Sequence, residues 1–173
     1  MSEAAKYSAV EVLRNGRQLT IRALRPDDRP DFLAAVERTS AQSLYRRFFG
    51  AKRGFTSQEE KFFLDVDFVK QVALVAVLEE AGRPVIIAGG RYVVIEPGKS
   101  EVAFVVIDQY QGQGIGTALL RHLAAMAGGQ GINELIAEVL PENRSMLKVF
   151  EKSGFDMVTK RDGQVLHVTL RMP

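Results

Sequence analysis

The sequence predicts the α+β class (an α/β mixed sheet), in which helices flank a mostly antiparallel sheet. Two observations lead to this class. Three apolar, β-rich runs, 71–78, 84–94 and 101–107, follow one another across short turns and indicate an antiparallel meander. The pattern then changes to helix, strand and helix between 112 and 152, which places helices on the faces of the sheet.

The N-terminal part is expected to form a β-hairpin followed by helices. Two short alternating runs, 9–13 and 18–24, enclose Asn15-Gly16, a dipeptide that favours positive φ in a two-residue hairpin turn. Pro26 marks the start of one helix, and a second helix is expected after Ser40.

Two local signals follow in the middle of the chain. The stretch Ser57–Glu60 has capping-box spacing, which predicts the start of a third helix. Gly89-Gly90 interrupts the second apolar run of the meander, and we expect a bulge or bend there.

The C-terminal part begins with a glycine-rich segment, 112–116, that leads into an amphipathic helix. A strand at 134–140 and a second helix from Pro141 to Lys152 follow, and Gly154 ends that helix at its C′ position. A hairpin around Asp162-Gly163 closes the chain.

The amino-acid composition excludes several kinds of catalytic chemistry. The chain has 173 residues, 46% of them hydrophobic and 25% charged, which predicts one globular domain over residues 1–173. It has no cysteine and only two histidines, His122 and His167, so thiolate chemistry is excluded and no metal site is expected. Serine-histidine-aspartate chemistry is improbable because no serine lies in a G-x-S-x-G turn.

Charge and hydropathy exclude two kinds of partner. The formal net charge of +2 is small and scattered, which argues against nucleic acid. No apolar run approaches the roughly 20 residues that a membrane span needs, and Met1–Tyr7 has no signal-peptide core. We therefore expect a cytoplasmic protein without a membrane partner.

The strongest local signal is the glycine-rich turn 111–117 between a strand and a helix. Free amides at a helix N-terminus bind phosphates, and glycines at 112, 114 and 116 remove the Cβ atoms that would keep a pyrophosphate away. A Walker P-loop is excluded because no lysine follows the glycines, and position 117 is Thr where a dinucleotide-binding fingerprint needs glycine. A tight turn that holds no ligand is the alternative.

The turn Gln111-Gly112-Gln113-Gly114-Ile115-Gly116 resembles the Gln/Arg-x-x-Gly-x-Gly/Ala signature of the GNAT superfamily of N-acetyltransferases. The setting is similar as well, because Asn143 and the ending Phe150-Glu151-Lys152-Ser153-Gly154-Phe155 follow at the distances found in that family. The resemblance covers about residues 18–171. It implies a GNAT-like acyl-CoA N-acyltransferase fold and acetyl-CoA as cosubstrate, without a metal.

The resemblance also implies a set of cofactor-binding residues. The pyrophosphate of acetyl-CoA would lie on the turn, and the pantetheine arm would lie between the splayed ends of strands 101–107 and 134–140. Asn143 would bond this arm from the other side, although it is equally suited to cap its own helix. The residues implied are Val105, Val106, Ile107, Gln111, Gly112, Gln113, Gly114, Ile115, Gly116, Thr117 and Asn143.

Direct transfer to an amine needs a base, because a lysine amine with a pKa of about 10.4 is almost fully protonated at pH 7. Glu101 begins the cofactor strand and is the candidate, with a solvated strand end as the alternative. The sequence most resembles bacterial protein lysine acetyltransferases that inactivate acyl-CoA synthetases, through 43–49, 65–67 and Glu101-Val102-Ala103-Phe104. In those enzymes a glutamate at this strand position is the general base.

One position departs from the family. Phe150 stands where many GNAT enzymes have a tyrosine that protonates the leaving thiolate, so Tyr110 or Ser145 would have to assist, or no side chain does. The predicted function is an acetyl-CoA-dependent N-acetyltransferase acting on a primary amine, with a protein lysine of an acyl-CoA synthetase as the expected partner. A small-molecule amine acetyltransferase and a non-catalytic acyl-CoA-binding module are the alternatives. The acceptor, the oligomeric state and any regulatory domain stay open.

Overall fold

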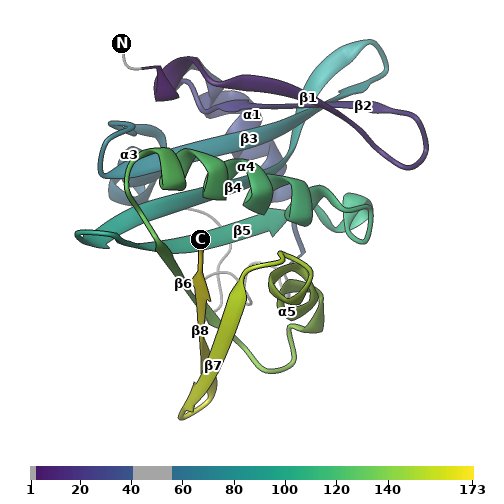
Figure 1. The fold of residues 1–173 in the computed structure, drawn as a ribbon. Helices are drawn as coiled ribbons and strands as arrows, with labels where there is room; N and C mark the ends of the chain where they lie inside the picture. The colour runs from purple at the N-terminus through teal and green to yellow at the C-terminus, as the bar shows by residue number, and fades with distance from the viewer. Residues whose placement is uncertain (1–2, 41–55) are drawn as a thin grey trace.

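The computed structural model describes residues 3–40 and 56–173. The helix expected after Ser40 and the motif at 43–49 lie outside the described residues. Within them the chain forms one eight-stranded sheet with strand order β1-β2-β3-β4-β5-β6-β8-β7 (Figure 1). Every neighbouring pair of strands is antiparallel except β5 and β6, which are parallel. The predicted mixed, mostly antiparallel sheet is confirmed.

The elements follow the order that the sequence predicts. The strands are β1 (Ser8–Val12), β2 (Gln18–Ala23), β3 (Gln71–Glu80), β4 (Arg83–Glu96), β5 (Lys99–Val106), β6 (Glu134–Val139), β7 (Asp156–Asp162) and β8 (Val165–Arg171). The helices are α1 (Arg29–Glu37), α3 (Ser57–Leu64), α4 (Ile115–Gly129) and α5 (Arg144–Glu151), with short 3₁₀ turns η1 (Ala4–Lys6), η2 (Pro26–Asp28) and η3 (Asp108–Tyr110). Among these, no helix has the length and apolar character to cross a membrane.

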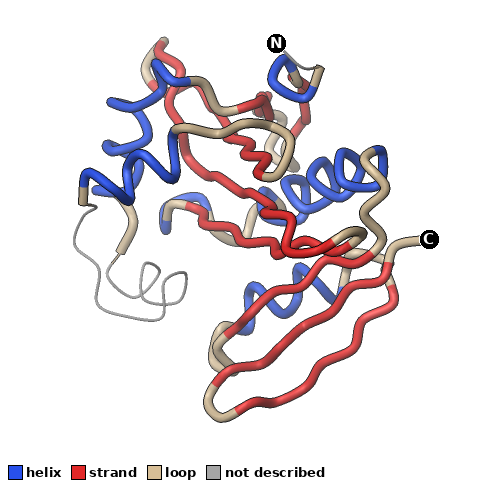
Figure 2. The backbone as a smooth tube through the Cα atoms, turned by 90° about the vertical axis from the view of Figure 1, so that its left-hand side faces the viewer, coloured by secondary structure: helices blue, strands red, loops and turns tan. Residues whose placement is uncertain are grey.

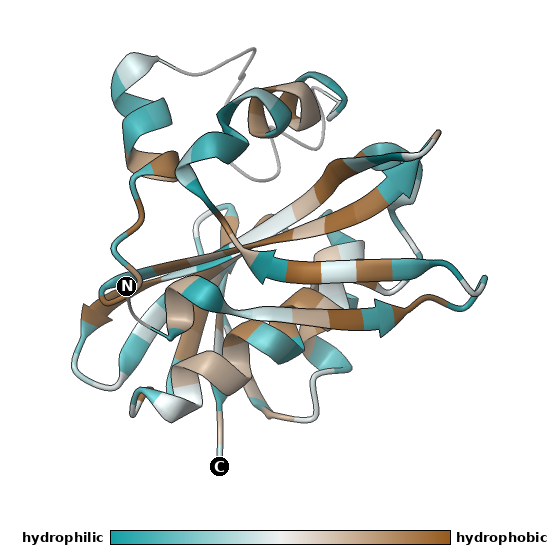
Figure 3. Ribbon diagram, turned by 90° about the horizontal axis from the view of Figure 1, so that it is seen from above, coloured by the Kyte–Doolittle hydropathy of each residue, from teal (hydrophilic) through white to brown (hydrophobic). Residues whose placement is uncertain are grey.

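Helices cover both faces of the sheet (Figure 3). Helix α4 packs on β3, β4 and β5 and buries Leu119 and Leu123 completely, as its amphipathic pattern predicts. On the opposite face, α1 packs on β4, over a smaller apolar cluster that includes Val75 and Ile86. The sheet core is therefore closed by α4 on one side and by α1 and α3 on the other.

The sheet opens between β5 and β6. Only Lys99, Ser100 and Glu101 of β5 pair with β6, although β5 continues to Val106. Figures 1 and 2 show β6, β8 and β7 turning away from the N-terminal strands beyond this point. As expected, the two strands splay at their C-terminal ends, and this leaves one edge of β5 without a strand partner.

Two local predictions are off by one residue. The N-terminal hairpin has a three-residue loop, because Leu13 N–H donates to the Arg17 carbonyl at 2.9 Å, and only Gly16 of the Asn15-Gly16 pair has positive φ. The capping box uses Thr56 and Glu59 in place of Ser57 and Glu60: the Glu59 N–H donates to Thr56 Oγ1 at 3.2 Å, and the Thr56 N–H donates to Glu59 Oε1 at 3.0 Å.

The bulge expected at Gly89-Gly90 lies elsewhere. Both glycines pair regularly with Val75 and Leu74, and the register shifts at the next step, where Ile87 is the extra residue. Gly90 has a packing role, because a Cβ there would lie 2.6 Å from Cδ1 of the buried Phe104 ring.

We therefore expect Gly90→Ala to destabilise the fold by about 1–3 kcal/mol through overpacking. Gly89→Ala is the matched control, because its added Cβ meets only the Leu74 carbonyl oxygen at 3.6 Å, an ordinary contact. Urea denaturation of both variants gives the comparison. Equal free energies of unfolding for the two variants would contradict this packing account.

Candidate active site

The splayed strands form one wall of a groove of about 540 Å³. Its other walls are the glycine-rich turn, the first turn of α4, and α5. Of the predicted cofactor residues, all but Ile107 and Gln113 line this groove: Val105, Val106, Gln111, Gly112, Gly114, Ile115, Gly116, Thr117 and Asn143. The structure therefore brings together two segments that are about 30 residues apart in the sequence.

The glycine-rich turn exposes backbone amides at the start of α4. Gly112 and Gly114 have φ values of +80° and +85°, which favour glycine, and a Cβ added to either would meet no atom within 4 Å. The first intrahelical bond runs from the Ala118 N–H to the Gly114 carbonyl at 3.0 Å, so the N–H groups of residues 115–117 have no acceptor within the helix. Gly116 differs, because its Cβ would lie 3.4 Å from Val149 Cγ2, where α4 meets α5.

The main chain of β5 faces the groove at alternate residues. Ile107 N–H donates to the Ile87 carbonyl at 2.9 Å, and the Ile107 carbonyl accepts from Tyr110 N–H at 2.8 Å. Because antiparallel ladders bond every second residue, Val105 also directs its main-chain groups to β4, while Phe104 and Val106 direct theirs to the open edge. The sequence suggests the main chain of residues 105–107 for binding the pantetheine arm. Of these only Val106 faces the open edge, and Phe104 was missed, because only the strand register fixes the alternation.

Two polar side chains line the groove. Gln111 Nε2 donates to the Val106 carbonyl at 3.0 Å and holds the turn against β5. Asn143 is the N-cap of α5, with its Oδ1 accepting from Met146 N–H at 3.3 Å. Asn143 also lines the groove, and no hydrogen bond from its Nδ2 to another described residue is found, so capping and ligand binding are compatible at this residue.

Glu101 stands where β6 leaves β5. It is the last residue of β5 that pairs with β6, opposite Ile136, and its side chain is exposed. The strand alternation puts Glu101 on the same face as Ala103 and Val105, the face that carries α1 and α3. The carboxylate is therefore outside the groove and at the end of it.

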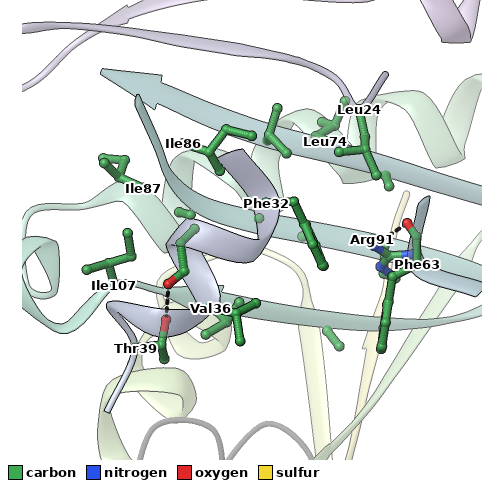
Figure 4. A pocket seen from close by; sticks show the side chains of 18 residues that line it. Leu24, Phe32, Val36, Thr39, Phe63, Leu74, Ile86, Ile87, Arg91 and Ile107 are labelled. Atoms are coloured by element: carbon green, nitrogen blue, oxygen red, sulfur yellow. Dashed lines mark hydrogen bonds between the residues drawn. The ribbon is translucent and has the colours of Figure 1, made fainter. Parts of the chain in front are cut away.

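A second, apolar cavity of about 70 Å³ lies on that face, beneath α1 and α3 (Figure 4). Phe32 and Val36 of α1, Phe63 of α3 and the buried Arg91 of β4 are among the residues around it. The Arg91 guanidinium stacks 4.7 Å from the centre of the Phe63 ring, and its Nη2 donates to the Phe63 carbonyl at 3.0 Å. Ala103 and Val105 line both this cavity and the groove, so the two spaces meet at β5.

Asp65 and Asp67, the two aspartates that the sequence offers as further candidates, have structural roles. Asp67 Oδ1 accepts hydrogen bonds from the N–H groups of Val69, Lys70 and Gln71, each at 3.0 Å, and these bonds hold the pKa of Asp67 below its usual value. This is the turn role that the sequence left open for Asp67, whereas Asp65 ends α3.

The candidate proton donors for the leaving thiolate differ in their surroundings. The Tyr110 hydroxyl donates to the Glu80 carboxylate, which also holds Arg38 at 2.9 Å. Phe150 is buried, and the centre of its ring lies 6.2 Å from the centre of the Phe104 ring, as expected for a core residue. Ser145 lines the groove with an exposed side chain.

His122 has partners that the sequence does not reveal. Its Nε2 lies 2.6 Å from Glu11 Oε1, its Nδ1 bonds the Tyr7 hydroxyl, and Arg121 also bonds Glu11. These bonds connect α4 to the N-terminal hairpin and hold the pKa of Glu11 below its usual value, with the His122 bond as the largest cause. His122 does not line the groove, and no group of three metal-ligating side chains is found in the described part of the chain.

We expect His122→Ala and His167→Ala to keep most of the activity. His122→Ala should lower the melting temperature more than His167→Ala, because it removes partly buried bonds to Tyr7 and Glu11, whereas the bond from His167 to Asp162 is exposed. Steady-state kinetics and thermal denaturation test both statements. A loss of kcat by about 10²-fold, the size expected for a general base, in a folded variant would assign the histidine to the chemistry instead.

The comparisons agree with this fold. Residues 38–155 match the model of the acetyltransferase (GNAT) family. An acetyltransferase of Pseudomonas aeruginosa is 31% identical over 91% of this chain and 87% of its own length. The acetyltransferase Pat of Mycolicibacterium smegmatis is 32% identical over 89% of this chain, which spans 46% of that longer protein.

Solved structures of similar fold point to the same family. The GNAT domain of S. lividans PAT superposes with a TM-score of 0.87 and is 34% identical over 95% of this chain and 97% of that one. A cAMP-binding acyltransferase from Mycobacterium smegmatis has a TM-score of 0.67 and 30% identity, with 98% of this chain and 48% of that chain covered. The chain belongs to the GNAT family of acetyltransferases.

Proposed function

We propose that the chain is a single-domain, cytoplasmic N-acetyltransferase that transfers the acetyl group of acetyl-CoA directly to a protein lysine. One observation carries the proposal: a single groove runs from the amides of the glycine-rich turn along β5 to Val102, the residue next to Glu101. The resemblance of residues 43–49 and of Glu101-Val102-Ala103-Phe104 to bacterial protein lysine acetyltransferases favours a protein acceptor over a small amine.

The groove suits the parts of acetyl-CoA in order. The amides of residues 112–117 hold the pyrophosphate at the positive end of α4. The open edge of β5 offers main-chain groups of Phe104 and Val106 to the amide-containing pantetheine arm, and Asn143 offers its Nδ2 from α5. This places the thioester near Ala103, where the groove meets the face of Glu101.

The chemistry then needs one proton acceptor and a leaving group. Acetyl-CoA supplies an activated acyl group as a thioester. The lysine ammonium gives up one proton to Glu101, directly or through a water, and its nitrogen forms the new bond to the acyl carbon as the carbon–sulfur bond breaks. The nitrogen's second proton passes to the leaving thiolate, directly or through water, so the products are the amide and the CoA thiol. A thiol with a pKa near the roughly 8.5 of free cysteine leaves readily, so a buried Phe150 is tolerated where a proton donor would otherwise stand.

The test is to incubate the protein with labelled acetyl-CoA, a purified acyl-CoA synthetase and a panel of small amines. We expect label on a lysine of the synthetase, located by mass spectrometry, at a higher kcat/KM than on any small amine. Label on a small amine alone would establish the alternative acetyltransferase. Binding of acetyl-CoA without transfer to any acceptor would support a non-catalytic module.

A further inference from the structure

The groove is lined by basic side chains that form no ion pair within the described residues. Three cations line it, Arg14, Lys148 and Lys152, against one carboxylate, Glu138. None of the three cations takes part in an ion pair within the described residues. Many other basic side chains are paired with carboxylates, among them Arg22, Arg29, Arg38, Lys99, Arg121 and Arg171.

Arg14 reaches the groove from the N-terminal hairpin, about 100 residues before the glycine-rich turn. It is the first residue of the β1–β2 loop, next to the buried Leu13. Figure 1 shows this loop at the same end of the molecule as the start of α4.

Arg17, at the other end of the loop, holds the hairpin there. Its guanidinium lies 5.9 Å from the centre of the Tyr110 ring, directly before the glycine-rich turn, and its Nη2 donates to the Glu79 carbonyl at 2.8 Å. The loop that carries Arg14 is therefore anchored and does not depend on a ligand for its position.

The α5 wall of the groove also carries positive charge. Lys148 and Lys152 are four residues apart at the end of α5, so they lie on one face of the helix as neighbouring like charges. Such a pair is unfavourable by about 0.2–0.5 kcal/mol in an isolated helix, and a bound anion relieves the repulsion.

We propose that Arg14 binds a phosphate of the CoA nucleotide, across the groove from Lys148 and Lys152. This inference rests on the proposed function, which places CoA in the groove. A guanidinium suits the task because its planar fork donates two hydrogen bonds to one phosphate group. The 3′-phosphate, a monoester with a charge of about −1.5 to −2 at pH 7, and the pyrophosphate share this chemistry.

Arg14→Gln is the test, with three ligands. We expect acetyl-CoA to bind roughly 10- to 150-fold more weakly, as for loss of a hydrogen bond to a charged group, and the difference to shrink as salt is added. S-acetylpantetheine, which lacks every nucleotide phosphate, should bind both proteins equally in a chemical-shift titration. Acetyl-dephospho-CoA separates the two phosphates: an undiminished effect assigns Arg14 to the pyrophosphate, and a lost effect assigns it to the 3′-phosphate.

Arg83→Gln is the matched control, because Arg83 is an exposed arginine in the neighbouring β3–β4 hairpin and does not line the groove. Equal affinity of Arg14→Gln and wild-type protein for acetyl-CoA would overturn the inference. So would an equal loss with S-acetylpantetheine, which would make Arg14 structural. If wild-type protein does not bind acetyl-CoA, the proposed function itself fails together with the inference.

Discussion

Glu101→Gln is expected to lower kcat by about 10²–10⁴-fold, the usual contribution of a general base, with nearly unchanged affinity for acetyl-CoA. The separation of the two effects follows from the structure. Glu101 lies on the α1 and α3 face of β5 and does not line the groove that we assign to the cofactor. In the proposed function its carboxylate therefore faces the amine and not the phosphates.

Two comparisons sharpen this experiment. Glu79→Gln, a change in an exposed glutamate of β3 in the same sheet, should leave kcat unchanged. Raising the pH should partly rescue Glu101→Gln, because a larger fraction of the lysine amine is then already deprotonated. A near-wild-type rate for Glu101→Gln at pH 7 would place the base elsewhere, with Asp65 or a bound water next, since Asp67 is committed to its loop. Loss of acetyl-CoA binding would make Glu101 structural.

Gly114→Val is expected to weaken acetyl-CoA binding by roughly 10- to 100-fold, the loss of one charge-assisted hydrogen bond or more. The added side chain meets no protein atom within 4 Å, so it extends into the open groove where the pyrophosphate is proposed to lie. Calorimetry on the folded variant measures the change.

The same substitution also strains the backbone, because Gly114 has a φ of +85°. Gly82→Val controls for this strain: Gly82 has a φ of +79° and similar open space, and it lies in the β3–β4 turn, which does not line the groove. Both variants should lose stability, and only Gly114→Val should lose affinity. Unchanged affinity in Gly114→Val would remove the cofactor site from this turn.

The sequence was sufficient to predict those features that depend only on residues close to one another along the chain. The glycine-rich turn, the amphipathic α4 and the order of strands follow from local periodicity and turn residues. Even there, boundaries moved by one residue, as with Thr56 in place of Ser57, because both residues are adequate caps and tertiary packing chooses between them.

Features that depend on strand register or on distant contacts were not predictable. The main-chain direction of Phe104 follows from its pairing with Gly90, and the requirement for glycine at 90 comes from the Phe104 ring. The bonds from His122 to Tyr7 and Glu11 join residues more than 100 positions apart. Arg14 lines the groove for a similar reason, because Arg17 holds its hairpin against Tyr110.

A crystal structure of the protein with acetyl-CoA tests the central claim most directly. We expect the pyrophosphate on the amides of residues 112–117 and the pantetheine arm along the open edge of β5. The acetyl group should lie near Ala103, with its carbonyl carbon facing the Glu101 side of the sheet. Acetyl-CoA bound outside this groove, or with its acetyl group on the α4 face away from Glu101, would contradict the account.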